Sequence, residues 1–141
     1  MRDLYPLFEP VSVRWGDMDA MGHVNNATYF TYCESARMRF FDRVGMEAHC
    51  ADGQYGPAVV SATCNFYRQV HYPAQLEVGV RVSKLGKSSF TLEYALLRAE
   101  NEEMVADGSS VVVWVDYHAG KSLPLPEELR RALEERGTLP T

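Results

Sequence analysis

The feature that most constrains the fold is a long amphipathic helix, predicted for residues 26–44. Its apolar side chains recur at helical spacing, at Tyr29, Cys33, Ala36, Phe40 and Val44. Asn25 or Asn26 is suited to cap the first turn, because a short side-chain oxygen accepts hydrogen bonds from the free backbone N–H groups there. Gly45 is suited to end the helix, because glycine adopts the left-handed conformation without strain. A helix of this length spans roughly 28 Å, so the rest of a small domain has to pack around it.

Beyond this helix the apolar residues change to a period of two, which is typical of strands with one buried face. The alternation occupies residues 60–66, 76–83 and 90–96. A fourth strand is predicted for residues 104–117, where the continuously apolar residues 111–115 indicate a central strand covered on both faces. A first strand precedes the helix at residues 11–15, and a short second helix is predicted for residues 124–137.

This order of elements predicts an α+β fold, in which an antiparallel five-stranded sheet wraps around the long central helix and a short helix follows. A sheet with one strongly apolar face and a helix bury their apolar surfaces together if the sheet curls around the helix. The 141 residues, of which 46% are hydrophobic, are enough for one core, so we expect residues 1–141 to form a single domain. An unpaired edge strand and an outer sheet face that is not uniformly polar favour self-association.

Composition argues against several classes of partner. A net charge of −5 with no basic cluster argues against nucleic acid as the main partner. No apolar run approaches the roughly 20 residues that span a bilayer, and the first ten residues lack the apolar core of a signal peptide. The cysteines, Cys33, Cys50 and Cys64, are odd in number and lack metal-ligand spacing. We therefore expect a cytoplasmic protein that binds neither nucleic acid nor a membrane.

A loop rich in ionisable groups, residues 16–26, leads directly into the predicted helix. Asp19 lies seven residues before Asn26, so the loop can bring its carboxylate back over the helix end. The free N–H groups at a helix start can stabilise an oxyanion, and a carboxylate can act as nucleophile or general base. On the residues alone, this catalytic interpretation of Asp19 and a purely structural one stand about even. For Asp17 we expect a structural role, bonding N–H groups of the loop.

The segment Gly-Asp-Met-Asp-Ala-Met-Gly-His-Val-Asn-Asn-Ala-Thr-Tyr, residues 16–29, resembles the signature of hotdog-fold acyl-CoA thioesterases of the 4-hydroxybenzoyl-CoA thioesterase type. Its Asp-x-x-x-His-Val-Asn-Asn part is also similar to plant acyl-ACP thioesterases. The Tyr72-Pro73 pair before a strand and residues 86–90 at a hairpin fit the same fold. Ala20 stands where many members have proline. Met21 replaces an asparagine of the acyl-ACP enzymes, which argues against transferring their version of the site.

The resemblance implies a hotdog domain whose catalytic carboxylate is Asp19 and whose oxyanion site is formed by backbone N–H groups near Asn26. It gives His23 a supporting role, although a structural histidine is the commoner outcome. The residues that would bind substrate are Asn25, Tyr29, Phe66, Arg68, Lys87, Ser88 and Ser89. Of these, the aromatic pair would shape an acyl pocket or simply fill the core, and the cationic and hydroxyl residues would contact coenzyme A phosphates or lie in solvated turns. Asn25 is also a candidate helix cap.

We therefore expect an acyl-CoA thioesterase that releases a free acid and coenzyme A, with water as the second substrate. No metal and no cofactor is implied, since coenzyme A is part of the substrate. The resemblance also implies a homodimer or homotetramer. Two alternatives are a non-catalytic acyl-CoA binding module and a hotdog hydratase or dehydratase. The acyl group, the choice between nucleophilic and general-base mechanisms, and the physiological pathway stay open at the level of sequence.

Overall fold

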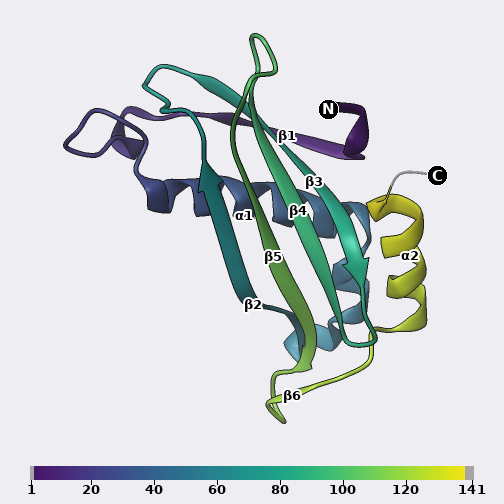
Figure 1. Cartoon of the computed structure of the whole chain (residues 1–141). Helices are drawn as coiled ribbons and strands as arrows, with labels where there is room; N and C mark the ends of the chain where they lie inside the picture. Colours follow the sequence, from purple (N-terminus) through teal and green to yellow (C-terminus); the bar gives the residue numbers. More distant parts are fainter. Residues whose placement is uncertain (1, 139–141) are drawn as a thin grey trace.

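The computed structural model describes residues 2–138 and has a curled antiparallel sheet crossed by one long helix (Figure 1). The sheet order is β1-β3-β4-β5-β2, and a short strand, β6, pairs with β5. The strands are β1 (Leu7–Ser12), β2 (Tyr55–Phe66), β3 (Gln75–Leu85), β4 (Ser89–Arg98), β5 (Met104–Asp116) and β6 (Lys121–Ser122). The helices are α1 (Asn26–Arg43) and α2 (Glu127–Gly137), with short 3-10 turns at Arg2–Leu4, Trp15–Asp17, Met46–His49 and Ala51–Gly53.

Helix α1 forms where the sequence predicts it, because both of its ends carry the expected local signals. Asn25 is the N-cap, and its side-chain oxygen accepts a hydrogen bond from the Ala27 N–H at 2.9 Å. Gly45 adopts the left-handed conformation with φ 68° just beyond the other end. The buried side chains of α1 are Tyr29, Tyr32, Cys33, Ala36, Phe40 and Phe41, so its apolar stripe faces the sheet.

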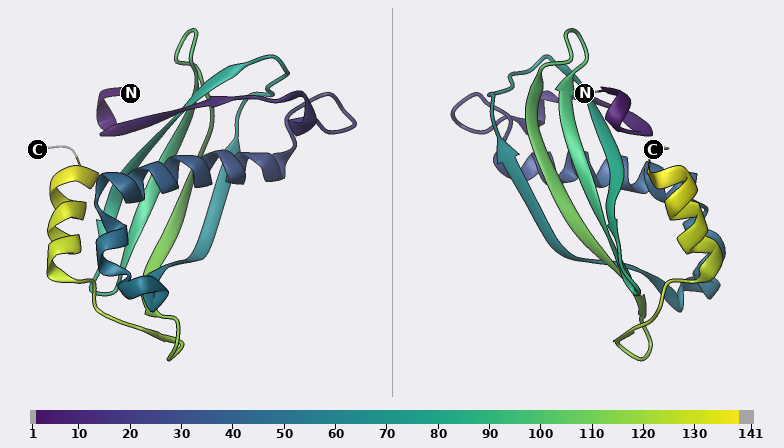
Figure 2. Two further views of the ribbon diagram at one scale, coloured as in Figure 1. Left: turned by 180° about the vertical axis from the view of Figure 1, so that it is seen from behind. Right: turned by 45° about the vertical axis from the view of Figure 1, so that its right-hand side comes forward.

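The core lies between α1 and the concave face of the sheet, as the two further views show (Figure 2). Ala36 and Phe40 of α1 are fully buried, as is the inward row of β3, made of Leu76, Val78 and Val80. Helix α2 packs Leu129 and Leu133 into the same core beside β3. The predicted α+β fold, a sheet wrapped around a central helix with a short C-terminal helix, is therefore confirmed. Neither helix among residues 2–138 is long and apolar enough to cross a bilayer.

The first strand is displaced from its predicted place at residues 11–15. β1 runs from Leu7 to Ser12, and the chain turns into a 3-10 turn that begins at Trp15. The alternation that suggested a longer strand continues only as far as Val13, which is buried and still donates its N–H to the Ala74 carbonyl. At Trp15 the alternation breaks, because this side chain is 77% exposed. Strand pairing therefore ends where the loop begins to fold on itself.

The apolar face predicted for residues 60–66 is largely exposed in this chain. β2 is an edge strand that pairs with β5 alone, and a register shift between Val59 and Ser61 changes which residues point inward. Val60 is 62% exposed as a result. β5 has the predicted central position, but the prediction that both of its faces are covered is wrong for this chain: Val112 and Trp114 are buried while residues 111, 113 and 115 are half-buried.

Candidate active site

The loop between β1 and α1 is tied to the helix by Asp17, whose carboxylate is buried. Its Oδ2 accepts hydrogen bonds from the Arg14 N–H at 2.9 Å and from the Tyr32 hydroxyl at 2.7 Å. Its main-chain carbonyl accepts a third from the Asn25 N–H at 3.0 Å. Asp17 thus connects the loop to both the cap and the second turn of α1, and its predicted structural role is confirmed.

The surroundings of Asp17 determine its charge state. Burial alone would raise the pKa of the Asp17 carboxyl, but the hydrogen bonds from Arg14 and Tyr32, together with the Arg14 charge, outweigh burial and lower this pKa below its ordinary value. Burial and the bond to Asp17 raise the pKa of the Tyr32 hydroxyl. At neutral pH this pair is therefore a carboxylate accepting a bond from a protonated phenol.

Asp19 lies two residues further on and is exposed. Its Oδ1 accepts hydrogen bonds from the Met21 N–H at 2.9 Å and the His23 N–H at 3.3 Å. Its own N–H donates to the His23 carbonyl at 2.8 Å, so hydrogen bonds join Asp19 and His23, the two ends of this five-residue turn. Its Oδ2 accepts no hydrogen bond from residues 2–138, so half of the carboxylate is available for other chemistry.

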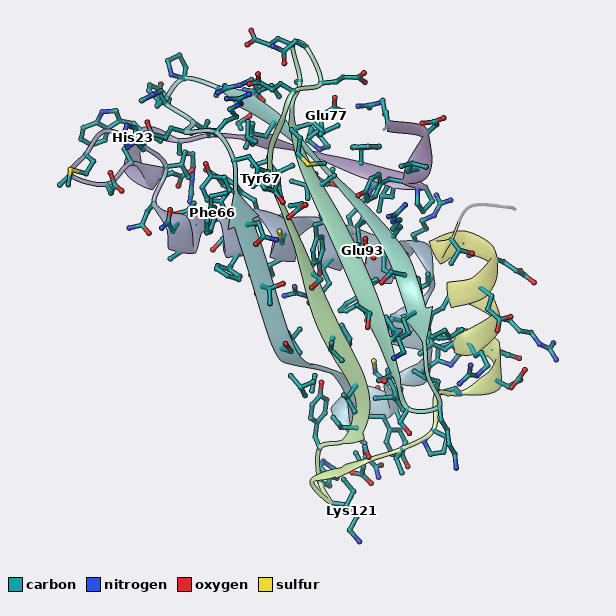
Figure 3. All side chains as sticks on the ribbon, in the orientation of Figure 1. His23, Phe66, Tyr67, Glu77, Glu93 and Lys121 are labelled. Atoms are coloured by element: carbon teal, nitrogen blue, oxygen red, sulfur yellow. The ribbon has the colours of Figure 1, made fainter. Side chains whose placement is uncertain are left out.

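Asp19 lines a cavity of about 300 Å³ at the N-terminal end of α1. The other lining residues are His23, Val24, Asn26, Tyr29, Phe66, Tyr67, Arg68 and Gln69. Figure 3 shows His23, Phe66 and Tyr67 at this end of the molecule, with Lys121 at the opposite end. The fold therefore brings together six residues singled out in the sequence, from the loop, from α1 and from the end of β2.

The start of α1 leaves one backbone donor free at this cavity. The Ala27 N–H donates to the Asn25 side chain, and the Thr28 N–H donates to the Asn25 carbonyl. The Asn26 N–H donates to no group among residues 2–138. Among the first three amides of the helix, Asn26 is thus the one whose N–H can bind an incoming oxygen.

One wall of the cavity is aromatic. The rings of Tyr29 and Phe66 meet edge-on with centroids 5.1 Å apart, and Tyr29 also meets Tyr32 edge-on at 5.9 Å. Tyr29 is buried, and burial raises the pKa of its hydroxyl, whereas Phe66 is 42% exposed at the end of the edge strand. This wall can pack against an apolar group, and its exposed side lies at the sheet edge.

Four of the predicted substrate-binding residues do not line this cavity. Asn25 caps the helix without lining it. Lys87, Ser88 and Ser89 occupy the turn between β3 and β4 and the start of β4, at the far end of the sheet (Figure 1). There the Lys87 carbonyl accepts from the Leu125 N–H, and the Ser88 carbonyl accepts from the Trp114 N–H. Their proposed contact with substrate stays a prediction.

Sequence reasoning did not find Val24, Tyr67 or Gln69 as lining residues. The predicted strand ended at Phe66, and Tyr67 and Gln69 lie one and three residues beyond it, on either side of Arg68. The signal available was therefore their position beside two residues already expected to bind substrate. The Tyr67 hydroxyl donates to Asp107 Oδ2 at 2.9 Å. That bond depends on the pairing of β2 with β5, which the sequence around Tyr67 does not encode.

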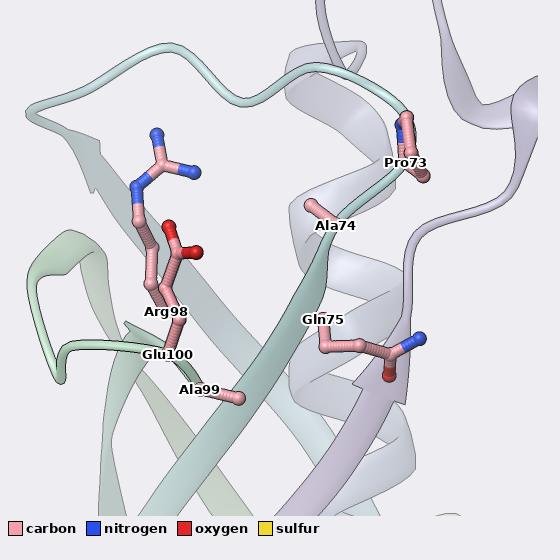
Figure 4. A pocket seen from close by; sticks show the side chains of 6 residues that line it. All are labelled: Pro73, Ala74, Gln75, Arg98, Ala99 and Glu100. Atoms are coloured by element: carbon pink, nitrogen blue, oxygen red, sulfur yellow. The ribbon is translucent and has the colours of Figure 1, made fainter.

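Two clearly larger hollows do not combine a carboxylate with a free helix-start N–H. A cavity of about 520 Å³ is lined by Pro73, Ala74, Gln75, Arg98, Ala99 and Glu100 (Figure 4), where the Arg98 guanidinium is already bound by Glu103 and the Gln69 carbonyl. An open groove of about 710 Å³ lies against the same loop and also includes Asp19, but not Asn26. Its other lining residues are Trp15, Gly16, Met18, Ala20, Gly22 and Tyr72. Within residues 2–138, no group of three or more His, Cys, Asp or Glu side chains could hold a metal ion.

Comparison with known proteins matches nearly the whole chain. The profile of a family described as the Thioesterase-like superfamily matches residues 13–133. The crystal structure of the protein PA5185 from Pseudomonas aeruginosa is 36% identical, with a TM-score of 0.86 over 97% of this chain and 95% of that one. A thioesterase from Thermus thermophilus, crystallised with coenzyme A and zinc, is 33% identical, with a TM-score of 0.83 over 97% and 98%.

Two protein sequences are similar to this chain over nearly its whole length. The protein YsmA from Bacillus subtilis is 33% identical over 129 residues, which are 92% of this chain and 86% of that protein. The long-chain acyl-CoA thioesterase FadM from Escherichia coli is 26% identical over 125 residues, covering 89% and 95%. The similarity therefore includes both the loop with its carboxylates and the sheet that encloses α1.

Proposed function

The chain belongs to the thioesterase-like superfamily, and we propose that it is an acyl-CoA thioesterase, which converts an acyl-CoA and water to a free acid and coenzyme A. The observation that carries this proposal is one cavity lined by both Asp19 and Asn26, where a carboxylate oxygen and a helix-start N–H are free. The Thermus thioesterase with coenzyme A and the acyl-CoA thioesterase FadM support the same reaction by similarity.

Two mechanisms use this pair of groups. The Asp19 carboxylate attacks the thioester carbonyl, the carbon–sulfur bond breaks, and water then hydrolyses the resulting mixed anhydride. Alternatively, Asp19 takes a proton from water, which attacks the carbonyl directly and displaces the coenzyme A thiolate. In both, the Asn26 N–H stabilises the oxyanion that forms on the carbonyl oxygen, a contribution of roughly 2–4 kcal/mol per donor in measured cases. His23 supports the same centre by holding Asp19 through its backbone.

The other residues of the cavity suggest how the substrate binds. Tyr29 and Phe66 offer an apolar wall for the part of the acyl-CoA next to the thioester. The exposed Arg68 forms no ion pair within residues 2–138 and is a candidate for a phosphate of coenzyme A. Lys87, Ser88 and Ser89 do not line this cavity, so we expect them to contact the substrate from the β3–β4 turn of a second copy of the chain.

We propose a homodimer or homotetramer for this reason, formed in the cytoplasm. The outer edge of β2, which pairs with no strand among residues 2–138, supports self-association. It presents free backbone groups together with the exposed side chains of Val59, Val60 and Phe66. The three free cysteines agree with a reducing compartment.

The first experiment is the release of free thiol from a panel of aromatic and fatty acyl-CoAs by the wild type and by Asp19→Asn. We expect turnover of at least one acyl class, a loss of about 10²–10⁴-fold in kcat in the variant, and unchanged substrate binding by calorimetry. Asp42→Asn, an exposed carboxylate of α1 outside the cavity, is the matched control and should be as active as the wild type. Binding without turnover across the panel would replace the thioesterase by a non-catalytic binding module.

A second experiment tests the oxyanion donor. Asn26 is the first residue of α1, a position where proline is well tolerated, and Asn25 has φ −60° and ψ 137°, which suits the residue before a proline. Asn26→Pro therefore removes the N–H and preserves the helix, whereas Asn26→Ala keeps the N–H and removes only the side chain. We expect kcat to fall about 10²–10³-fold in Asn26→Pro and to change little in Asn26→Ala. Equal activity of the two variants would remove Asn26 from the oxyanion site.

A further inference from the structure

The loop that carries Asp19 is held to the body of the protein by two neighbouring residues that follow β2. The Val24 N–H donates to the carbonyl of the buried Val70 at 2.9 Å. The next residue, His71, places its ring Nδ1 2.9 Å from the Gly22 carbonyl oxygen. These bonds fix the returning half of the loop, residues 22–24, against a segment that is remote in sequence.

The partner of His71 determines its tautomer. A carbonyl oxygen only accepts hydrogen bonds, so the Nδ1 atom of His71 carries a proton and donates it to Gly22. The same ring packs edge-on against the ring of His23, with centroids 4.8 Å apart and planes at 66°. Gly22 has a φ of 81°, a left-handed conformation that favours glycine, so the bond to His71 is made at a specialised turn of the backbone.

A movement of residues 22–23 would displace the proposed catalytic carboxylate of Asp19, because His23 is hydrogen-bonded to it. His23 donates its N–H to Asp19 Oδ1, and the His23 carbonyl accepts from the Asp19 N–H. Within residues 2–138, every hydrogen-bond partner of Asp19 lies in its own loop. The position of its carboxylate above the start of α1 therefore depends on how firmly residues 22–24 are held.

We propose that His71 is a positioning residue of the active site, which fixes the Asp19–His23 loop through its hydrogen bond to the Gly22 carbonyl. It does not line the cavity and acts through the loop. This role rests on the proposed thioesterase function. A displacement of about 1 Å at a reacting group can lower the rate about 10²-fold. Loss of the single hydrogen bond between His71 and Gly22 can therefore lower kcat measurably.

Two substitutions separate the hydrogen bond from the ring contact. His71→Phe keeps an aromatic ring beside His23 and removes the donor, whereas His71→Asn keeps an N–H donor near the position of Nδ1 and removes the ring. His71 is exposed, so neither change should prevent folding. His118→Phe is the matched control, since this exposed histidine follows β5 at the opposite end of the sheet.

We expect kcat for thiol release to fall about tenfold or more in His71→Phe, with KM within about threefold of the wild type, because ground-state binding does not require the exact carboxylate position. His71→Asn should recover kcat to within about threefold of the wild type, and His118→Phe should match it. A wild-type kcat in His71→Phe, or an equal loss in both His71 variants, would overturn the hydrogen-bond role.

A second measurement needs no turnover. Amide hydrogen exchange of residues 19–24 should be at least about fivefold faster in His71→Phe than in the wild type, and close to the wild type in His71→Asn. If the wild type hydrolyses no acyl-CoA, the proposed function fails while this measurement still tests the role of His71 in the loop. Unchanged exchange in His71→Phe would show that the Gly22 bond does not hold the loop.

Discussion

Asp17 and Asp19 are two residues apart in one loop, yet their carboxylates have opposite surroundings. Asp17 is buried, and its Oδ2 is bonded by Arg14 and Tyr32. Asp19 is exposed, bonds only N–H groups of its own loop, and keeps one oxygen free at a cavity. The same side chain thus stabilises the fold at one position and is available for reaction at the other, because burial and bond partners differ.

The largest expected effect on stability is the loss of the buried Asp17 carboxylate, which should destabilise the fold much more than the loss of Asp19. Asp17→Ala leaves the buried Tyr32 hydroxyl without its partner and removes a charged acceptor, so we expect a loss of roughly 2–4 kcal/mol in the free energy of unfolding. Asp19→Ala exposes loop N–H groups to water and should cost less than about 1 kcal/mol. Urea denaturation of both variants measures the difference. Similar losses would mean that the two carboxylates do not differ as their surroundings suggest.

Tyr32→Phe tests the hydrogen bond between helix and loop by itself. It removes the donor to Asp17 Oδ2 and keeps the ring, so we expect a loss of about 1–2 kcal/mol. Tyr29→Phe is the matched control, since the Tyr29 hydroxyl bonds no residue among 2–138. In the double variant with Asp17→Ala the losses should be clearly less than additive, because both changes break one bond. Full additivity would show that the bond contributes little.

The lowered pKa of the Asp17 carboxyl should make the stability of the fold depend on pH in acid. Because its pKa is lower in the folded state than the ordinary value of 3.8, the carboxylate stabilises the fold above that value, and this contribution is lost as the pH falls through the folded pKa. Unfolding of the wild type and of Asp17→Asn at a series of pH values should show a gap that is constant near neutrality and narrows in acid, below about pH 4. A gap that widens in acid would contradict this sign.

The smallest effect is expected at the exposed partner of Asp17. The Arg14 guanidinium lies 3.3 Å from Asp17 Oδ1, but its side chain is 78% exposed. Such surface ion pairs contribute about 0–1 kcal/mol, so Arg14→Ala should lower the unfolding free energy by less than about 0.5 kcal/mol, with less effect still in high salt. The backbone N–H of Arg14, which makes the shorter bond to Asp17, is unaffected. A loss as large as that in Tyr32→Phe would place the guanidinium among the main supports of Asp17.

Much of the site could be predicted because it is local. The loop and the helix it precedes are contiguous, so the cap at Asn25, the structural role of Asp17 and the approach of Asp19 to the start of α1 follow from short-range spacing. Phe66 was predicted to contact substrate as an aromatic residue, and Arg68 from its charge and its position in the family. The fold brings both to the same cavity. Their position at the cavity depends on how the strands pair, which the spacing of residues in the sequence does not reveal.

The predictions that proved wrong concern the end of β1 and the burial of β2 and β5, which depend on neighbouring strands. The first strand was placed too late because the alternation from Val11 to Trp15 does not show where pairing with β3 stops. The inward face of β2 was predicted to be covered because alternation reports the apolar face of a strand, but not whether anything lies against it. For β5, a continuously apolar run does not reveal that its outer face is covered only in part.

By itself, the sequence determined the elements whose signals lie within a few residues of one another: the long helix with its cap, the alternating strands, and the loop that carries two aspartates and a histidine. Only the tertiary structure decided which of these meet. The pairing order of the sheet brings residues 66–71 to the loop, so that Phe66 and Tyr67 line the cavity and His71 reaches Gly22, while Lys87 is left at the far end. The physical reason is that side-chain periodicity records the face on which a residue lies, whereas contacts between distant segments depend on strand order and register.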